Sequence, residues 1–222
     1  MIRIFDILLA CIGLLALGPI LILLVLVLRV TGEGEVIYKQ TRVGKHGAHF
    51  SLLKFATMQK NSPNIGSGEI TIKNDPRVLP VGRFLRKSKL NELPQLLNIL
   101  VGDLSLVGPR PLVPNTFLQY DAQVQLALNS VSPGLTGVGS IFFRDEEKWL
   151  DSKEDPGEFY REVIAPYKGQ LEVWYVNNRS IWLYWKIIFA TAWIVIFPSS
   201  TLHERFLADL PPAPGGLLTK SC

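Results

Sequence analysis

The feature that most constrains the fold is an uncharged apolar run near the start of this 222-residue chain. No charged side chain occurs from Ile7 to Leu28. Arg3 and Asp6 precede the run, and Arg29 follows it. As a helix, at roughly 1.5 Å per residue, the run is long enough to cross a bilayer. It is too long for a signal peptide, and no small-residue cleavage site closes it, so it predicts a membrane-embedded helix.

Gly18 and Pro19 interrupt this run near its middle. Proline removes a backbone donor and clashes with the carbonyl four residues back, so it kinks a helix. Two arrangements are compatible with the pattern: a kinked single-pass helix, and a re-entrant helix that is broken at Pro19 and leaves by the face it entered. Arg3 before the run and a basic group after it favour re-entry, because positive residues mark the cytoplasmic side. The basic group after the run comprises Arg29, Lys39, Arg42 and Lys45.

The balance of charge also restricts the partners. The formal net charge of +4 suits an anionic membrane surface or phosphorylated ligands. No dense Lys/Arg stripe and no known reader motif occurs, so nucleic acid is not an expected partner. Cys11 and Cys222 form neither a CxxC motif nor a His/Cys cluster, which indicates a body facing a reducing cytoplasm, without zinc.

After the apolar run, the pattern changes to short strands and amphipathic helices. Val36–Tyr38 and His49–Phe55 read as the strands of a hairpin that turns at Gly44–Gly47. Helices are predicted over Val81–Lys87, Leu90–Leu100, Phe117–Asn129, Phe159–Asn178 and, with tryptophans suited to a membrane interface, Ile181–Phe197. The expected class is α+β: a membrane helix over residues 1–30, for which the flanking charges favour re-entry, then a domain over 31–205 made of a small β-hairpin and several amphipathic helices packed at the membrane surface. A flexible tail is expected over 206–222.

The stretch from Arg83 to Pro111 concentrates the residues that carry chemistry. Asn91 is a good helix N-cap, and Glu92 suits the positive field of a first helical turn. That pair alone is explained equally well by helix capping. Arg110 lies between Pro109 and Pro111, which fix the backbone on both sides of it. Such an arginine suits a bidentate grip on phosphate, and a buried pair with an acidic side chain such as Asp103 is the alternative.

Further motifs accompany this stretch in a fixed order. They are Arg3–Asp6, Gln40–Gly47, Phe50, Lys54–Phe55, Asp75–Val78, Gly82–Lys87, Glu92–Gln95, Gly102–Asp103, Gly108–Pro111 and Pro133–Gly137. From Arg3 to about Thr191, the chain thereby resembles the bacterial sugar transferase family. More narrowly, it is similar to the small monotopic phosphoglycosyl transferases, which load a phospho-sugar onto polyprenol phosphate.

The resemblance implies a site and a reaction. A sugar 1-phosphate passes from a nucleoside diphosphate-sugar, usually a UDP-sugar, to undecaprenyl phosphate, which initiates surface glycan synthesis. By the resemblance, Glu92 binds Mg²⁺ and Lys54 supports the nucleophile. The substrate-binding residues are Arg86, Arg110 and Arg144, together with Arg77, Pro109 and Pro111. The expected location is the bacterial inner membrane, with the catalytic domain on the cytoplasmic face, in contact with membrane lipid and with downstream glycosyltransferases as partners.

Four residues depart from the family pattern: Asn91, Ala56, Ser132 and Tyr184. Asn91 stands where the family has its nucleophilic aspartate, and a neutral amide lacks the anionic oxygen for covalent attack. Three explanations stay open: a natural subgroup in which Glu92 or another carboxylate such as Asp75 attacks, an engineered variant, or a member that binds lipid or a partner without turnover. Independently of the resemblance, a single-pass anchor carrying an interaction domain is a further alternative.

Overall fold

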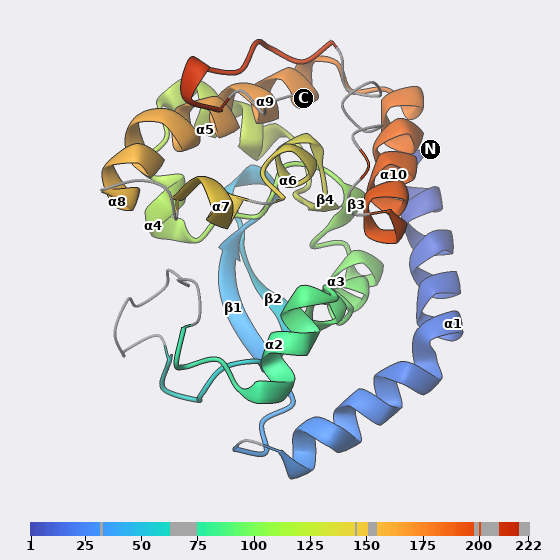
Figure 1. The fold of residues 1–222 in the computed structure, drawn as a ribbon. Coiled ribbons are helices and arrows are strands. Elements are labelled where there is room, and N and C mark those ends of the chain that lie inside the picture. The colour runs from blue at the N-terminus through green and yellow to red at the C-terminus, as the bar shows by residue number, and fades with distance from the viewer. Residues whose placement is uncertain are drawn as a thin grey trace. The chain divides into compact units, whose positions relative to one another are not determined.

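The computed structural model describes residues 1–31, 33–62, 75–144, 146–150, 155–197, 200 and 209–217. The described chain consists mainly of helices, with two small two-stranded sheets (Figure 1), so the expected mixture of helices and strands is confirmed. It divides into two compact units. The first unit comprises Met1, residues 3–41 and residues 51–102, and the second comprises Ile2, residues 42–50 and residues 103–222.

The first unit begins with helix α1, which runs without interruption from Ile2 to Val30. Pro19 lies inside it, and the helix bends near its middle (Figure 1). The expected break at Pro19 is therefore wrong: the helix bends there without ending. A proline removes only one hydrogen bond of the ladder, so the turns on either side of Pro19 keep their own hydrogen bonds.

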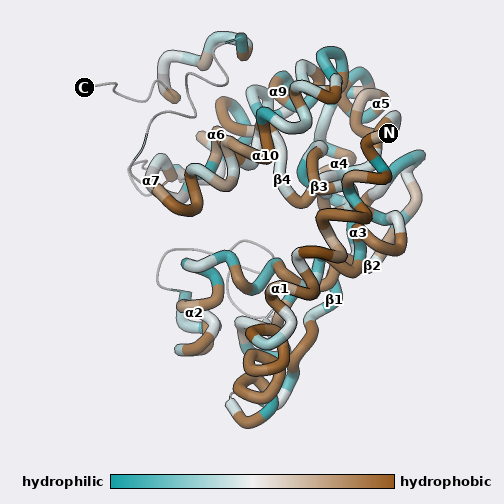
Figure 2. The backbone as a smooth tube through the Cα atoms, turned by 90° about the vertical axis from the view of Figure 1, so that its right-hand side faces the viewer, coloured by the Kyte–Doolittle hydropathy of each residue, from teal (hydrophilic) through white to brown (hydrophobic). Residues whose placement is uncertain are grey.

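Helix α1 is long and apolar enough to cross a membrane by length and composition. Most of its surface is brown in Figure 2, and only 11% of its most apolar window is buried. Its last turns pack against the rest of the unit, where Leu24 and Leu28 form a cluster with Phe55 and Leu85. Its first turn is also held, because Arg3 donates hydrogen bonds to the carbonyls of the last turn of α3. Both ends of α1 thus contact the same unit.

The predicted β-hairpin is confirmed. Strand β1, Ile37–Val43, pairs with β2, His49–Phe55, around a 3-10 turn at Lys45–Gly47. Asn98 of helix α3, Gln95–Val101, ties that helix to β2: its side chain donates to the Ser51 carbonyl at 2.8 Å and accepts from the Leu53 amide at 2.9 Å. The hairpin therefore holds α3 through two side-chain hydrogen bonds.

Helix α2, Pro80–Lys87, agrees with the prediction, whereas the next helix starts later than expected. Leu90–Glu92 forms a 3-10 turn, and α3 begins only at Gln95. Lys89 separates α2 from that turn with a left-handed backbone, φ 59°. The expectation of Asn91 as N-cap is wrong, because Pro94 occupies that position. Pro94 has no N–H, so a helical ladder starting at Leu90 cannot continue through it.

The second unit is built around a parallel pair of short strands. Strand β3, Ser105–Val107, pairs with β4, Gly134–Thr136, with Ser105 opposite Gly134 and Val107 opposite Thr136. Helix α10, Ile181–Ile196, packs against both strands. Helix α9, Ala165–Asn177, packs against α5, Ala122–Ser130, and α6, Val138–Phe142 (Figure 1). The remaining short elements are α4 Pro114–Phe117, α7 Glu146–Leu150, α8 Pro156–Phe159, the π-helix Tyr160–Ile164 and the 3-10 turn Gly215–Leu217.

Two predicted boundaries differ in this unit. The helix expected over Phe117–Asn129 starts later than predicted. Helix α4 ends at Phe117, and α5 begins only after Asp121, which caps it by accepting from the Val124 amide at 2.9 Å. Part of the expected flexible tail is packed: the Tyr167 hydroxyl donates to the Pro211 carbonyl at 2.7 Å, and Leu217 is buried. The rest of that tail lies outside the described residues. The domain boundaries at residues 30 and 205 stay predictions.

Candidate active site

The first unit places Asn91 and Glu92 together in the 3-10 turn before α3. Asn91 is buried, with 8% of its surface exposed, and its Oδ1 atom has no hydrogen-bond partner within the described residues. Glu92 is half-buried. An unpaired buried carbonyl oxygen is costly unless a ligand supplies the missing partner. The turn therefore carries an amide and a carboxylate on successive residues, and both groups are oxygen donors of the kind that Mg²⁺ prefers.

Arg86 is positioned by the segment that follows β2. Its Nε donates to the Thr57 hydroxyl at 3.1 Å, and its Nη2 lies 3.5 Å from the Met58 sulfur. Helix α2 approaches this segment closely, because a Cβ on Gly82 would lie 2.1 Å from the Thr57 carbonyl oxygen. Lys54 is half-buried near the end of β2. The structure thus places Lys54, Arg86, Asn91 and Glu92 within one unit. Their predicted roles at one site stay predictions.

Arg77 has a different role from the one expected of it. It is 4% exposed and grips Asp75 bidentately, with Nε to Oδ1 at 2.9 Å and Nη2 to Oδ2 at 2.6 Å. Its Nη1 also donates to the Ser62 carbonyl at 2.7 Å. The guanidinium is therefore directed into the protein, and the expectation that Arg77 binds substrate is wrong in this structure. Asp75, which is 2% exposed, is held by the same pair and is not placed to attack a substrate.

In the second unit, backbone hydrogen bonds fix the turn that carries Pro109, Arg110 and Pro111. The Pro109 carbonyl accepts from the Gly134 amide at 2.8 Å. The Pro111 carbonyl accepts from Nη1 of Arg42 at 2.8 Å, so Arg42 supports the turn from the hairpin tip. The Arg110 side chain is exposed, which excludes the alternative of a buried pair with Asp103. The turn is held by its main chain and leaves the guanidinium at the surface.

Glycines let two backbone segments cross at this turn. A Cβ on Gly134 would lie 2.1 Å from the Gly108 nitrogen, and a Cβ on Gly137 would lie 2.2 Å from the Gly108 oxygen. In this crossing the Gly134 amide donates to the Pro109 carbonyl, and the Gly108 amide donates to the Thr136 carbonyl. Only residues without a side chain fit such a crossing. These glycines therefore serve close packing of β3 and β4.

Arg144 is exposed and anchors a helix end. Its Nη1 donates to the Ile194 carbonyl at 2.9 Å, in the last turn of α10. A cation at a helix C-terminus satisfies carbonyls that have no partner in the helix. The phosphate contact by Arg144 stays a prediction. In the structure, Arg144 also has a structural role, the hydrogen bond to the end of α10.

Sequence reasoning missed Glu172, which α9 buries beneath the Arg110 turn. One carboxylate oxygen accepts from the Arg110 amide at 3.4 Å, and the other is buried without a hydrogen-bond partner among the described residues. Burial raises the pKa of Glu172 to about 7, against the opposing effects of the Arg110 amide, Lys168 and the Arg110 charge. The available signal was a single carboxylate beside Leu171 and Tyr175 on the buried face of α9.

Lys168 lies one turn before Glu172 and belongs to a second charged group. Its ammonium contacts Glu146 at 2.6 Å and lies 5.0 Å from the Phe143 ring centre and 5.1 Å from that of Tyr160. Burial lowers the pKa of Lys168, and the neighbouring Glu146 opposes that shift. Burial raises the pKa of Tyr160 to about 12. This group ties α7 and the π-helix to α9.

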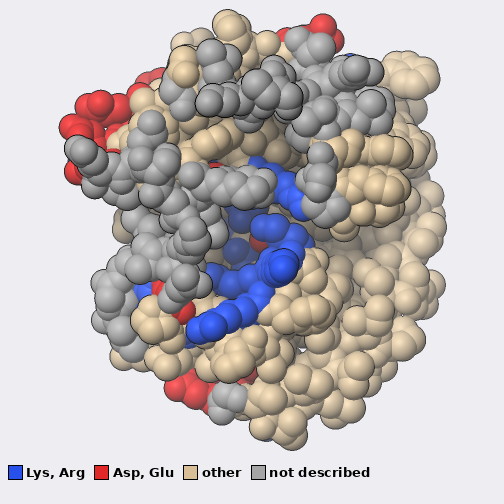
Figure 3. Space-filling view, viewed as in Figure 1, with Lys and Arg blue, Asp and Glu red and all other residues tan. Residues whose placement is uncertain are grey.

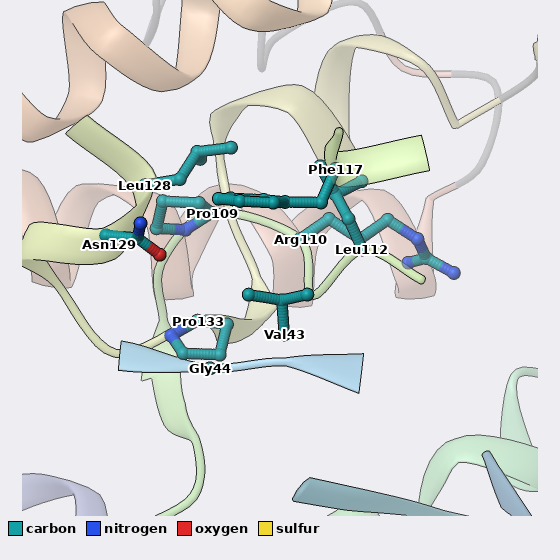
Figure 4. A pocket seen from close by; sticks show the side chains of 9 residues that line it. All are labelled: Val43, Gly44, Pro109, Arg110, Leu112, Phe117, Leu128, Asn129 and Pro133. Atoms are coloured by element: carbon teal, nitrogen blue, oxygen red, sulfur yellow. The ribbon is translucent and has the colours of Figure 1, made fainter. Parts of the chain in front are cut away.

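A small hollow of about 250 Å³, open to solvent, lies beside the Arg110 turn (Figure 4). The Arg110 side chain extends away from it, whereas the rings of Pro109 and Phe117 line it. Its lining is mostly apolar, and the Oδ1 atom of Asn129 is buried there without a hydrogen-bond partner in the described part of the chain. The complete lining is Val43, Gly44, Pro109, Arg110, Leu112, Phe117, Leu128, Asn129 and Pro133.

Basic side chains reach the surface in both units. Arg83 and Lys87 of α2 are exposed in the first unit, as is Arg110 in the second. Figure 3 shows Lys and Arg side chains on the face drawn there. No group of three or more His, Cys, Asp or Glu side chains suited to a metal ion occurs among the described residues.

Comparisons with known proteins agree with this assembly of motifs. A family model described as bacterial sugar transferase matches residues 1–198. The chain is 34% identical over 194 residues to undecaprenyl-phosphate glucose phosphotransferase of Komagataeibacter xylinus, and 34% identical over 209 residues to undecaprenyl-phosphate galactose phosphotransferase of Salmonella typhimurium. These matches cover 85% and 87% of the chain, but only 34% and 40% of those longer relatives. The chain is also 36% identical over 189 residues to the uncharacterized sugar transferase EpsL of Bacillus subtilis, with 85% of the chain and 84% of EpsL covered.

Proposed function

Because the chain belongs to the bacterial sugar transferase family, we propose that it transfers a sugar 1-phosphate from a UDP-sugar to undecaprenyl phosphate and so initiates surface glycan synthesis. The names of its relatives support this reaction: two are undecaprenyl-phosphate hexose phosphotransferases, and one from Escherichia coli is a UDP-glucose:undecaprenyl-phosphate glucose-1-phosphate transferase. The product is a lipid-linked sugar, which downstream glycosyltransferases would extend.

The observation that carries the proposal is the 3-10 turn of Asn91 and Glu92. It presents a half-buried carboxylate beside a buried amide oxygen that no described residue satisfies. These two oxygens fit a Mg²⁺ ion that also takes ligands from a diphosphate. When bound, the ion would neutralise phosphate charge at the site. Arg86, which donates to the Thr57 hydroxyl in the same unit, supplies further positive charge for phosphate oxygens. The exposed Arg110 of the second unit stays a predicted phosphate contact.

We assign the nucleophile to Glu92, and while it attacks phosphorus another group must hold the Mg²⁺. Asp75, the other carboxylate considered for this role, is buried in its pair with Arg77. A Glu92 carboxylate oxygen attacks the β-phosphorus of the donor, the bond to the bridging diphosphate oxygen breaks, and UMP leaves. An oxygen of undecaprenyl phosphate then attacks the same phosphorus, forms the lipid diphosphate-sugar and releases the carboxylate. The two steps conserve charge and atoms, and Lys54 contributes positive charge that supports the attacking group.

Membrane association follows from α1 and the family, and we propose the finer location as well. Both ends of α1 contact the first unit, Arg3 through α3 and Leu28 through the cluster with Phe55. A helix whose two ends hold one unit fits re-entry through a single face, which we place on the cytoplasmic side of the inner membrane. Helix α10 adds exposed apolar side chains suited to lipid contact. They are Trp182, Phe189, Trp193, Val195 and Ile196.

The decisive experiment is intact-protein mass spectrometry after incubation with Mg²⁺ and a panel of UDP-sugars without lipid acceptor. The expected result is an adduct of one sugar phosphate localised to Glu92, with release of UMP. Glu92→Gln, which keeps the size of the side chain, should abolish the adduct and reduce turnover on the order of a thousandfold. Glu158→Gln is the matched control, because Glu158 is exposed on α8 and should leave both unchanged. An adduct on another carboxylate would overturn the assignment to Glu92.

Because Asn91 lacks the anionic oxygen of an aspartate, one alternative function stays open: the protein binds donor or lipid without turnover. That alternative predicts donor binding with no adduct and no UMP release across the panel, in protein that is folded. It also predicts normal cell-surface glycan in a strain that carries Glu92→Ala. Loss of glycan in that strain would exclude it.

A further inference from the structure

We propose that Glu172 is a positioning residue for the reaction, which holds the Arg110 turn through the main-chain N–H of Arg110. The proposal rests on the proposed function insofar as Arg110 contacts a substrate phosphate. Glu172 lies far from Asn91 and Glu92 in the sequence. It is not proposed to contact a reacting atom. Its role is to fix the place from which the exposed Arg110 guanidinium reaches its ligand.

The first argument is the scarcity of donors in the turn. Pro109 and Pro111 have no N–H, so the Arg110 amide is the only backbone donor in the tripeptide. Glu172 accepts from that donor at 3.4 Å. The two flanking carbonyls are already fixed, that of Pro109 by the Gly134 amide and that of Pro111 by Arg42. Glu172 therefore completes the hydrogen bonding of the turn.

The second argument is the way in which the protein encloses the carboxylate. Glu172 is 8% exposed and lies against α6, where a Cβ on Gly139 would approach its Oε1 atom to 2.5 Å. A glycine at this position leaves room for the carboxylate where it lies. A leucine or glutamine would satisfy packing at lower cost than a buried carboxyl group, which loses its hydration. The second oxygen, Oε2, is buried without a hydrogen-bond partner in the described part of the chain. Its lost hydration is therefore not replaced by a hydrogen bond there.

The charge of Glu172 has a direct bearing on the hydrogen bond. Burial raises the pKa of Glu172 to about 7, so the side chain changes charge near neutral pH. An ionised oxygen accepts a hydrogen bond more strongly than a neutral carboxyl does. The charged groups that act on it are Lys168 of the same helix and Arg110 of the turn, both of which favour the ionised form. Helices α5 and α6 bring no ionisable side chain, so ionisation of Glu172 should tighten the turn as pH rises through about 7.

The test compares Glu172→Gln, Glu172→Ala and Gly139→Ala in the full-length protein. Hydrogen–deuterium exchange is measured at the Arg110 amide, and steady-state kinetics with the UDP-sugar are measured from pH 5.5 to 8.5, a range of about three units around neutrality. Glu172→Ala should raise the exchange rate of the Arg110 amide about tenfold and raise KM for the donor more than it lowers kcat. Glu172→Gln keeps an acceptor, so it should retain most activity and lose the inflection near pH 7.

Gly139→Ala tests the same contact without removing the carboxylate. The added methyl meets the flexible end of the Glu172 side chain, so the fold should tolerate it while the carboxylate moves away from Arg110. Its effects should resemble those of Glu172→Ala. Gly157→Ala and Glu158→Gln are the matched controls, because both residues are exposed. Neither control should alter exchange or kinetics.

Unchanged Arg110 exchange in folded Glu172→Ala or, if that variant fails to fold, in Gly139→Ala would overturn the proposal. A pH inflection near 7 that persists in Glu172→Gln would also count against the role of the charge. The exchange measurement separates this proposal from the proposed function. If wild-type protein shows no turnover with any donor, the function fails, while Arg110 exchange still decides whether Glu172 holds the turn.

Discussion

At the scale of single residues, burial separates the two carboxylates that were considered as the nucleophile, Asp75 and Glu92. Both oxygens of Asp75 accept from the Arg77 guanidinium, and the side chain is buried. Glu92 is half-buried, in the turn that also holds Asn91. Tyr184, one of the departures from the family pattern, is 1% exposed in α10 and stacks edge to face with Trp185. An aspartate in that place would need a buried partner, and the aromatic side chain removes this requirement.

Asn91→Asp restores an anionic oxygen at a buried position that already lacks a hydrogen-bond partner. If the turn binds Mg²⁺ and the donor diphosphate, the new carboxylate should serve as nucleophile. We expect turnover to rise about tenfold and the sugar phosphate adduct to move from Glu92 to residue 91. Peptide mapping of the trapped adduct measures this directly. A loss of activity with an unchanged melting temperature would contradict a metal at this turn, since a second carboxylate should strengthen Mg²⁺ binding.

Asp75→Asn should destabilise the protein without changing the chemistry. It leaves the Arg77 guanidinium buried with an uncompensated charge, which costs about 3 kcal/mol. The melting temperature in detergent should fall accordingly. Glu35→Gln breaks the exposed pair with Lys60, whose side chains are 41% and 71% exposed, and should cost less than about 1 kcal/mol. Equal effects of the two variants would show that burial of the Arg77 pair contributes nothing.

Glu172→Gln should stabilise the protein at pH 8 and have little effect at pH 5. The pKa of Glu172 is about 7 in the fold, whereas an unfolded glutamate ionises near about 4.3. Between these values the unfolded chain has lost a proton that the folded chain keeps, so stability falls as pH rises and stays lower above pH 7. The amide has no such proton, and the gain at pH 8 should be on the order of 2 kcal/mol. Melting temperatures across this range measure it, and a gain that is larger at pH 5 would contradict the sign.

At the scale of secondary structure elements, close backbone contacts place the functional side chains. Gly82 lets α2 approach the segment after β2, which brings Arg86 to the Thr57 hydroxyl. Gly134 plays the same part between β3 and β4, beside the turn that bears Arg110. In both cases a glycine allows two backbone segments to approach closely. That close approach places the helix or turn that carries the arginine.

Gly82→Ala should therefore be severe. The added Cβ would lie 2.1 Å from the Thr57 carbonyl oxygen, which is main chain and cannot rotate away. We expect a loss of about 3 kcal/mol in stability and a weaker grip of Arg86 on the donor. Gly18→Ala is the control in another helix of the same unit, where no atom lies within 4 Å, and it should stabilise α1 by about 1 kcal/mol or less. Equal melting temperatures for Gly82→Ala and wild type would refute the close approach of α2.

At the scale of the whole molecule, the central question is how α1 meets the bilayer. Its 29 residues would extend about 44 Å if straight, more than the apolar core of a bilayer. Pro19 bends it, and each end is tied to the first unit, at Arg3 and at Leu28. A spanning helix would have to hold one of these contacts on the far side of the membrane.

Cysteine labelling tests this topology. Ile2→Cys and Glu35→Cys, made in a background with Cys11 and Cys222 replaced by serine, should both resist an impermeant maleimide in intact spheroplasts. Both should react in inverted vesicles. Glu158→Cys, exposed on α8, reports the face of the second unit and should behave in the same way. Labelling of position 2 alone from the outside would establish a spanning helix and contradict re-entry.

The sequence by itself determined the elements whose signal is local. The apolar run made α1, the alternating strands and the Gly44–Gly47 turn made the hairpin, and the ordered motifs gave the family. Pairings between distant residues were decided only by tertiary structure, because a charge pattern does not specify its partner. Arg77 pairs with Asp75 inside the protein, and Pro94 instead of Asn91 is the N-cap of α3. Glu172, 62 residues after Arg110 in the chain, accepts from the Arg110 amide. Such contacts depend on which backbones approach one another, and that follows from the packing of the whole unit.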